Sequence, residues 1–139
     1  MQTKIYREQH GRLRQILREM AAMERSGSDD LDIRRSLGRL TGTVKIHLAG
    51  EDEGLYPRLL AHPDAAVRAK AQQFQESMGG LAAAYVAFAE KWTNAALMRD
   101  DRAGFFHELA GIIDALSKRM DLEDQELYAM ADRELAQSA

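Results

Sequence analysis

The sequence predicts an all-α fold, in which four helices form an antiparallel up-down-up-down bundle. Three observations support this fold. Apolar residues recur at three- and four-residue spacing in four long segments, no stretch alternates with the two-residue period of a strand, and there are only two prolines. Amphipathic helices joined by short links pack most simply with each helix antiparallel to the next. The chain has 139 residues, the size of one domain, so we assign residues 1–139 to a single bundle.

The first two helices are expected at about residues 5–23 and 31–60. Residues 26–28, Ser-Gly-Ser, separate them, because serine and glycine favour turns and helix caps. Pro57 is predicted to kink the second helix or to end it early, since proline lacks an N–H group and clashes with the preceding turn.

The third and fourth helices are expected at about residues 65–98 and 102–135. Gly79 and Gly80 weaken the third by roughly 1 kcal/mol each relative to alanine. Asp100 and Asp101 offer caps for the fourth. Two segments of the second and fourth helices look alike, since both contain an acidic run that leads into Leu-Tyr, at residues 50–56 and 122–128.

Composition narrows the function classes. The formal net charge of −3 argues against a surface for nucleic acid or anionic membranes. The absence of cysteine excludes disulfides, thiolate metal sites and cysteine nucleophiles. No apolar run approaches the roughly 20 residues of a membrane span, and the first residues lack the apolar stretch of a signal peptide, so we expect a cytoplasmic protein. The sequence contains no P-loop, dinucleotide fingerprint or His-Glu-x-x-His motif.

Four polar residues fall on the apolar stripes where the core is expected: His10, His47, Glu51 and Glu123. A buried carboxylate is costly unless it is paired or binds a metal. In bundles that bind metals through carboxylates, the ligands project inward from facing helices in this way. The four residues therefore predict a cation site. A single histidine on such a stripe is more often a hydrogen-bonded core residue, so each histidine taken alone indicates little.

The segment His47–Pro57, with His-x-x-x-Glu followed by more acids and Leu-Tyr-Pro, resembles the hemerythrin-like, HHE cation-binding family. His10 resembles the family's first histidine, and the acidic segment around Glu123 resembles the end of its last helix. The resemblance implies a site for two iron ions bridged by carboxylates. In that site His10 and His47 would bind one iron, and Glu51 and Glu123 would be the bridging carboxylates.

The chain departs from the family pattern at two ligand positions, where Met78 and Arg119 stand in place of histidines. Arginine offers no lone pair to a metal. The resemblance then implies at most one ion, with iron expected and manganese or zinc as alternatives. We predict that Arg119 replaces the charge of the lost metal by pairing with Glu51 or Glu123. In the alternative, Met120 points inward and Arg119 reaches the surface.

Two functions remain open on this basis. One is a cation-binding or sensing module with an incomplete di-iron site and a small ligand such as oxygen or nitric oxide. The other is a metal-free helical protein with a regulatory or interaction role. An enzyme with a mononuclear centre ranks below both, because no nucleophile or base appears beyond the expected ligands. Family members and bundles of this size often pair, which suggests a homodimer.

Overall fold

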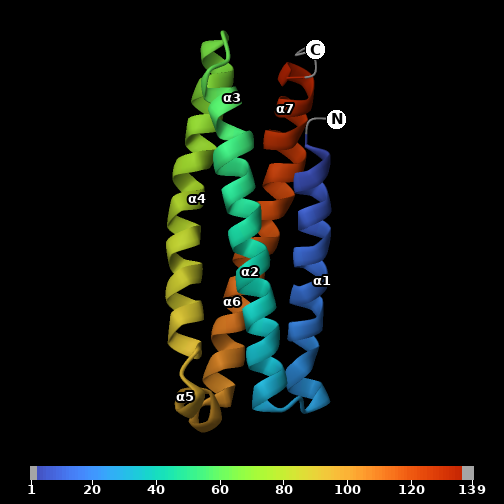
Figure 1. Ribbon diagram of the computed structural model, residues 1–139, viewed down its shortest axis with the longest axis vertical. Coiled ribbons are helices and arrows are strands. Elements are labelled where there is room, and N and C mark those ends of the chain that lie inside the picture. Colours follow the sequence, from blue (N-terminus) through green and yellow to red (C-terminus); the bar gives the residue numbers. More distant parts are fainter. Residues whose placement is uncertain (1–2, 136–139) are drawn as a thin grey trace.

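The computed structural model describes residues 3–135, which contain helices and short links but no strand, and it confirms the all-α prediction (Figure 1). The predicted domain, residues 1–139, extends beyond the described residues at both ends. The helical segments are α1 (Lys4–Ser26), α2 (Asp30–Gly54), α3 (Tyr56–Leu60), α4 (Ala65–Trp92), α5 (Ala95–Asp100), α6 (Arg102–Leu122), the π-helical turn η1 (Glu123–Leu127) and α7 (Tyr128–Leu135).

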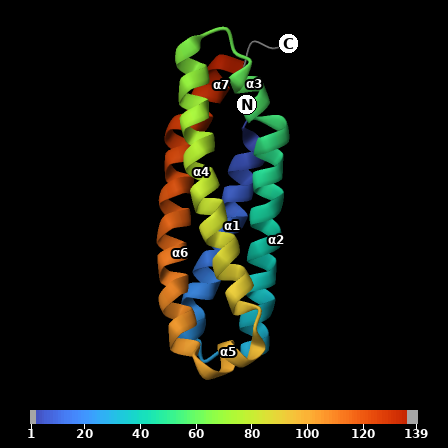
Figure 2. The ribbon, with the colours of Figure 1, turned by 90° about the vertical axis from the view of Figure 1, so that its left-hand side faces the viewer.

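Four long helical rods lie side by side in the bundle (Figures 1 and 2). They are α1, α2 continued by α3, α4, and α6 continued by η1 and α7. α1 packs against α2 and α6, and α4 packs against α6 and α2. α3 and α7 lie at one end of the bundle, and α5 lies at the other (Figure 2). None of the described helices is both long enough and apolar enough to cross a membrane.

Side-chain caps and one glycine fix the turns between the rods. α1 ends at Ser26, and the next residue is Gly27, whose φ of 69° lies in the left-handed region that favours glycine. The Asp29 side chain then accepts a hydrogen bond of 2.8 Å from the backbone N–H of Asp32 and starts α2. Asp64 and Asp101 cap α4 and α6 in the same manner.

The third predicted helix is shorter than expected. α4 ends at Trp92 rather than at residue 98, because Asn94 starts a new helix by accepting a hydrogen bond of 3.1 Å from the N–H of Leu97. The second predicted helix breaks at Leu55, and Pro57 lies in the first turn of α3, where no helical N–H bond is needed. The sequence thus predicts the interruption at Pro57 but not the one at Asn94.

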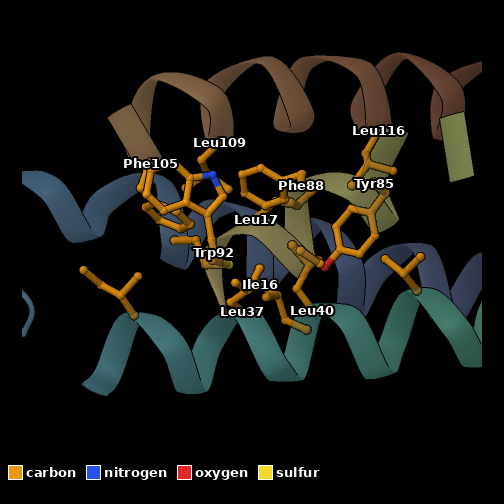
Figure 3. Packing of buried hydrophobic residues seen from close by; sticks show 14 of the residues in the cluster. Ile16, Leu17, Leu37, Leu40, Tyr85, Phe88, Trp92, Phe105, Leu109 and Leu116 are labelled. Atoms are coloured by element: carbon orange, nitrogen blue, oxygen red, sulfur yellow. The ribbon is translucent and has the colours of Figure 1, made fainter. Parts of the chain in front are cut away.

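The interior contains two hydrophobic clusters. The larger lies toward α5 and includes the rings of Phe88, Trp92 and Phe105, with ring centroids 5.7 Å apart for Phe88–Phe105 and 5.4 Å apart for Trp92–Phe105 (Figure 3). The smaller lies toward α3 and α7 and includes Tyr56 and Tyr128. The polar residues predicted from the sequence belong to neither cluster but lie between the two, where the surrounding helices exclude water.

Candidate metal centre

The four predicted ligands meet in the middle of the bundle. His10 comes from α1, His47 and Glu51 come from α2, and Glu123 is the first residue of η1. Their exposed fractions are 0%, 4%, 1% and 2% in that order. Side chains so far removed from water need partners or a bound ion to offset the cost of desolvation.

Both imidazoles are held by acceptors at Nδ1. His10 Nδ1 lies 2.8 Å from Asp124 Oδ1, and His47 Nδ1 lies 2.7 Å from the Gln9 side-chain oxygen. Because a carboxylate and an amide oxygen can only accept, each Nδ1 carries the proton. A neutral ring then presents a lone pair at Nε2. Metal-binding histidines are oriented in this way by a hydrogen bond at the other ring nitrogen.

The two Nε2 atoms point toward one place. They lie 3.2 Å apart, and Glu123 Oε1 is 2.9 Å from that of His10 and 3.6 Å from that of His47. Two nitrogens bound about 2.1 Å from one ion are about 3.0–3.4 Å apart for bond angles between 90° and 109°. His10, His47 and Glu123 therefore form a buried group that could bind one metal ion.

Glu51 lies beside this group with one oxygen unsatisfied. Its Oε2 accepts a hydrogen bond of 2.6 Å from the Tyr128 hydroxyl. Its Oε1 is 3.3 Å from His47 Nε2 and accepts no hydrogen bond from the described residues. Burial, with the nearby charge of Glu123, raises the pKa of Glu51 to about 7. A buried acceptor without a donor calls for a proton or a cation as its partner.

Arg119 is buried and contacts the other side of Glu123. Its Nε is 3.3 Å from Glu123 Oε2. The remaining guanidinium nitrogens donate to Ser77 Oγ at 2.8 Å, to the Phe74 carbonyl at 2.7 Å and to the Tyr56 hydroxyl at 3.3 Å. Its neighbour Met120 is also buried, so α6 turns both side chains toward the interior.

Burial and the neighbouring charged groups shift the pKa of Glu123 in opposite directions. Burial raises the pKa of this carboxyl, but hydrogen bonds with His10 and His47 and the charge of Arg119 outweigh that effect and hold the pKa well below its usual range. Arg119 is the only buried guanidinium or ammonium among the described residues, and it faces the two buried carboxylates of Glu51 and Glu123. One negative charge in the pocket is therefore left for a proton or a metal ion to neutralise.

Met78 lies beside the site on α4. It lines a cavity of about 20 Å³ together with His47, Arg119 and Glu123. That volume is enough for roughly one water-sized molecule. A surface cleft of about 330 Å³ between α2 and α4 also reaches Met78, and Glu51 forms part of its wall. The structure thus places Met78 between the buried group and the solvent-facing cleft.

Sequence reasoning missed several residues of the site. Asp124 was not among the predicted ligands, yet its side chain is only 23% exposed and contacts His10. Gln9, Tyr56 and Tyr128 were not predicted to take part. The repeated Leu-Tyr pairs at residues 55–56 and 127–128 were visible, but the spacing of an α-helix does not bring either tyrosine onto the face of its preceding glutamate.

A helical bundle with inward-facing imidazoles and carboxylates defines a class of cation-binding proteins. Comparison with models of protein families matches residues 1–131 to the hemerythrin HHE cation binding domain. The chain therefore belongs to the hemerythrin family. Comparisons with curated proteins and with solved structures gave no match.

Proposed function

We propose that this hemerythrin-family domain binds a single metal ion, with His10, His47 and Glu123 as ligands and Glu51 at its side. Iron is the metal we expect, with manganese or zinc as alternatives, because two imidazoles with carboxylates suit each of these ions. Bound there, the ion would supply a Lewis-acidic and, for iron, redox-active centre inside the bundle.

One observation carries this proposal. Each histidine has its Nδ1 held by an acceptor, and the two Nε2 atoms lie 3.2 Å apart, facing the same carboxylate oxygen. Lone pairs so arranged repel one another unless a cation lies between them. The unsatisfied Oε1 of Glu51 adds a second reason for positive charge at this point.

The place of a second metal is taken by Arg119 in this proposal. Glu123 directs Oε1 to the histidines and Oε2 to the guanidinium. Its carboxylate would therefore bridge one metal ion and Arg119 instead of two metal ions. Met78, with a thioether in place of an imidazole, does not supply the second histidine ligand that the family pattern has for that metal. We infer that reversible oxygen binding by a pair of iron ions is replaced by single-ion chemistry.

A metal-free role is the second candidate, and the contact between His10 and Glu123 favours it. Its length of 2.9 Å suits a hydrogen bond from a protonated imidazole to a carboxylate. Together with Arg119, such protons would neutralise the pocket without an ion. The domain would then act as a helical regulatory or interaction module.

The proposed function includes a sensing role, a small ligand and a cytoplasmic location. We propose that a small ligand such as oxygen or nitric oxide would bind next to the ion, on the side where the small cavity beside Met78 adjoins His47 and Glu123. We propose that the domain works in the cytoplasm as a sensor and forms a homodimer, and an enzymatic role ranks below this one. Its surface carries no overall positive charge to attract nucleic acid.

Thermal unfolding of the chelator-treated protein separates the two candidates. Addition of Fe(II), Mn(II) or Zn(II) in excess over the dissociation constant should raise the melting temperature, because an ion that binds only the folded state stabilises it. Magnesium is the control, since it binds imidazole poorly. If none of the three transition-series ions moves the transition beyond the magnesium control, the metal-free role replaces the proposal.

A further inference from the structure

We propose that the phenol oxygen of Tyr128 is a fourth ligand, which completes a four-coordinate site with His10, His47 and Glu123. This inference rests on the proposed single-ion function and extends it to a residue outside the predicted ligand set. A tyrosine ligand changes the chemistry of the ion, because a phenolate is a strong anionic donor that favours the oxidised, trivalent state of iron.

The π-helical turn η1 brings Tyr128 to the site. Tyr128 is five residues after Glu123, and its backbone N–H bonds to the Glu123 carbonyl. In an α-helix, five residues turn the chain through about 500°, so the two side chains would point about 140° apart. In a π-helical turn the backbone hydrogen bond joins residues five apart instead. Tyr128 therefore lies one turn after Glu123, on the same face of the helix. Such turns are frequent at functional sites.

The four donor atoms form a nearly regular tetrahedron. The Tyr128 oxygen is 3.2 Å from His10 Nε2, 3.4 Å from His47 Nε2 and 3.5 Å from Glu123 Oε1. The other three edges, among the two nitrogens and Glu123 Oε1, are 3.2, 2.9 and 3.6 Å. A regular tetrahedron with edges of about 3.3 Å has its centre about 2.0 Å from each corner, which is the length of a zinc–nitrogen or zinc–oxygen bond.

The Tyr128 hydroxyl proton has a defined acceptor. It is donated to Glu51 Oε2 at 2.6 Å, which leaves the oxygen lone pairs free to face the two histidines. When the oxygen binds as a phenolate, the O–H bond breaks, the proton passes to Glu51 and the net charge of the pocket is unchanged by the transfer.

Packing fixes the oxygen in place. The Tyr128 ring is fully buried, and its centroid is 5.9 Å from the Tyr6 ring and 5.2 Å from the His10 ring. The guanidinium of Arg7 lies over the ring at 5.4 Å. A side chain held from several sides presents its oxygen without loss of rotamer freedom on binding. The arrangement is therefore preorganised for a ligand.

The test compares Tyr128→Phe with Tyr6→Phe in the full chain. Each variant loses one hydroxyl and keeps its ring, and the Tyr6 hydroxyl donates to the Gly50 carbonyl rather than to the site. All three proteins are loaded with Fe(III), and the visible phenolate-to-iron charge-transfer absorption and the iron content are measured. We expect the absorption in the wild type and in Tyr6→Phe, and its loss in Tyr128→Phe.

A titration with Co(II) adds a readout of coordination and affinity. The wild type should show the intense d–d absorption of four-coordinate cobalt, and Tyr128→Phe should bind Co(II) at least about 10–100-fold more weakly, since loss of an outer-shell partner alone costs that much. Iron bound by the wild type without the charge-transfer band, or a band that survives in Tyr128→Phe, overturns the tyrosine ligand and leaves the single-ion function intact. A wild type that binds neither ion overturns both.

Discussion

Arg119 holds the oxygen of Glu123 that faces away from the histidines. The two residues are one helical turn apart, and Arg119 Nε lies 3.3 Å from Glu123 Oε2 while His10 Nε2 lies 2.9 Å from Oε1. Glu123 thus links an imidazole pocket suited to a cation with a cation that belongs to the chain itself. In the function proposed above, this arrangement would hold one metal ion and one guanidinium where the family pattern has two metals.

Replacement of this guanidinium should be costly. In the metal-free protein, Arg119→Ala leaves Glu123 buried without its partner, and we expect the free energy of unfolding to fall by about 3–5 kcal/mol. The control is Arg14→Ala, whose ion pairs with Asp121 and Asp124 are half-exposed, so the loss should stay near or below about 1 kcal/mol. Urea denaturation measures both values. Equal losses in the two variants would show that Arg119 does not offset the charge of Glu123.

Restoration of the missing imidazoles should restore the second ion. We expect the double variant Met78→His/Arg119→His to bind about two metal ions per chain, because imidazoles would then flank Glu51 and Glu123 on both sides. Met78→His alone keeps the guanidinium and should stay at one ion. Metal content measured by elemental analysis distinguishes these outcomes. A double variant that still holds only one ion would contradict the idea that Arg119 occupies the place of the second.

The acceptors behind the two histidines should control metal affinity. Asp124→Ala and Gln9→Ala each remove the group that orients one imidazole at Nδ1, so we expect metal binding to weaken by about 10–100-fold in each. Gln15→Ala is the matched control, because Gln15 lies on the same helix as Gln9 but its side-chain amide donates to the exposed Glu19 side chain and not to a histidine. Competition with a chelator of known affinity gives the dissociation constants. An unchanged constant in both variants would argue against histidine ligation.

The raised pKa of Glu51 predicts how stability varies with pH. The pKa is about 7 in the folded protein against an ordinary 4.5, so the fold favours the protonated form. The stabilisation is fully present below pH 4.5 and is lost as the pH rises toward 7. Between those values we expect the metal-free wild type to lose about 1–3 kcal/mol relative to Glu51→Gln, which cannot ionise.

Urea denaturation of both proteins at several pH values measures this difference, and other titrating groups cancel in the comparison. Parallel pH profiles for the wild type and Glu51→Gln would mean that the carboxyl is not forced toward its neutral form. Bound metal should reverse the trend, since a cation near Glu51 favours its charged form.

The sequence predicted the helical class and the meeting of His10, His47, Glu51 and Glu123, because apolar periodicity shows which residues of a helix face the core. Each of these residues lies on such a stripe, so its inward direction follows from spacing alone. The structure places all four within the interior, between the two hydrophobic clusters.

Tyr128 could not be predicted by the same reasoning. Its position depends on one π-helical turn, and a change from four to five residues per hydrogen-bonded turn leaves no clear mark on the apolar pattern. Asp124 was missed for a different reason. It follows Glu123 directly in an acidic run of the kind that usually faces solvent, and only the packing of α1 against η1 reveals its contact with His10.

The most direct test of the single-ion site is the metal content of protein purified without chelator. The wild type should hold about one ion per chain. His10→Gln and His47→Gln should each lose most of it, while His62→Gln, at the exposed link before α4 and close to Glu134 instead of the site, should retain it. A wild type without metal, or His47→Gln with an undiminished content, would contradict the account.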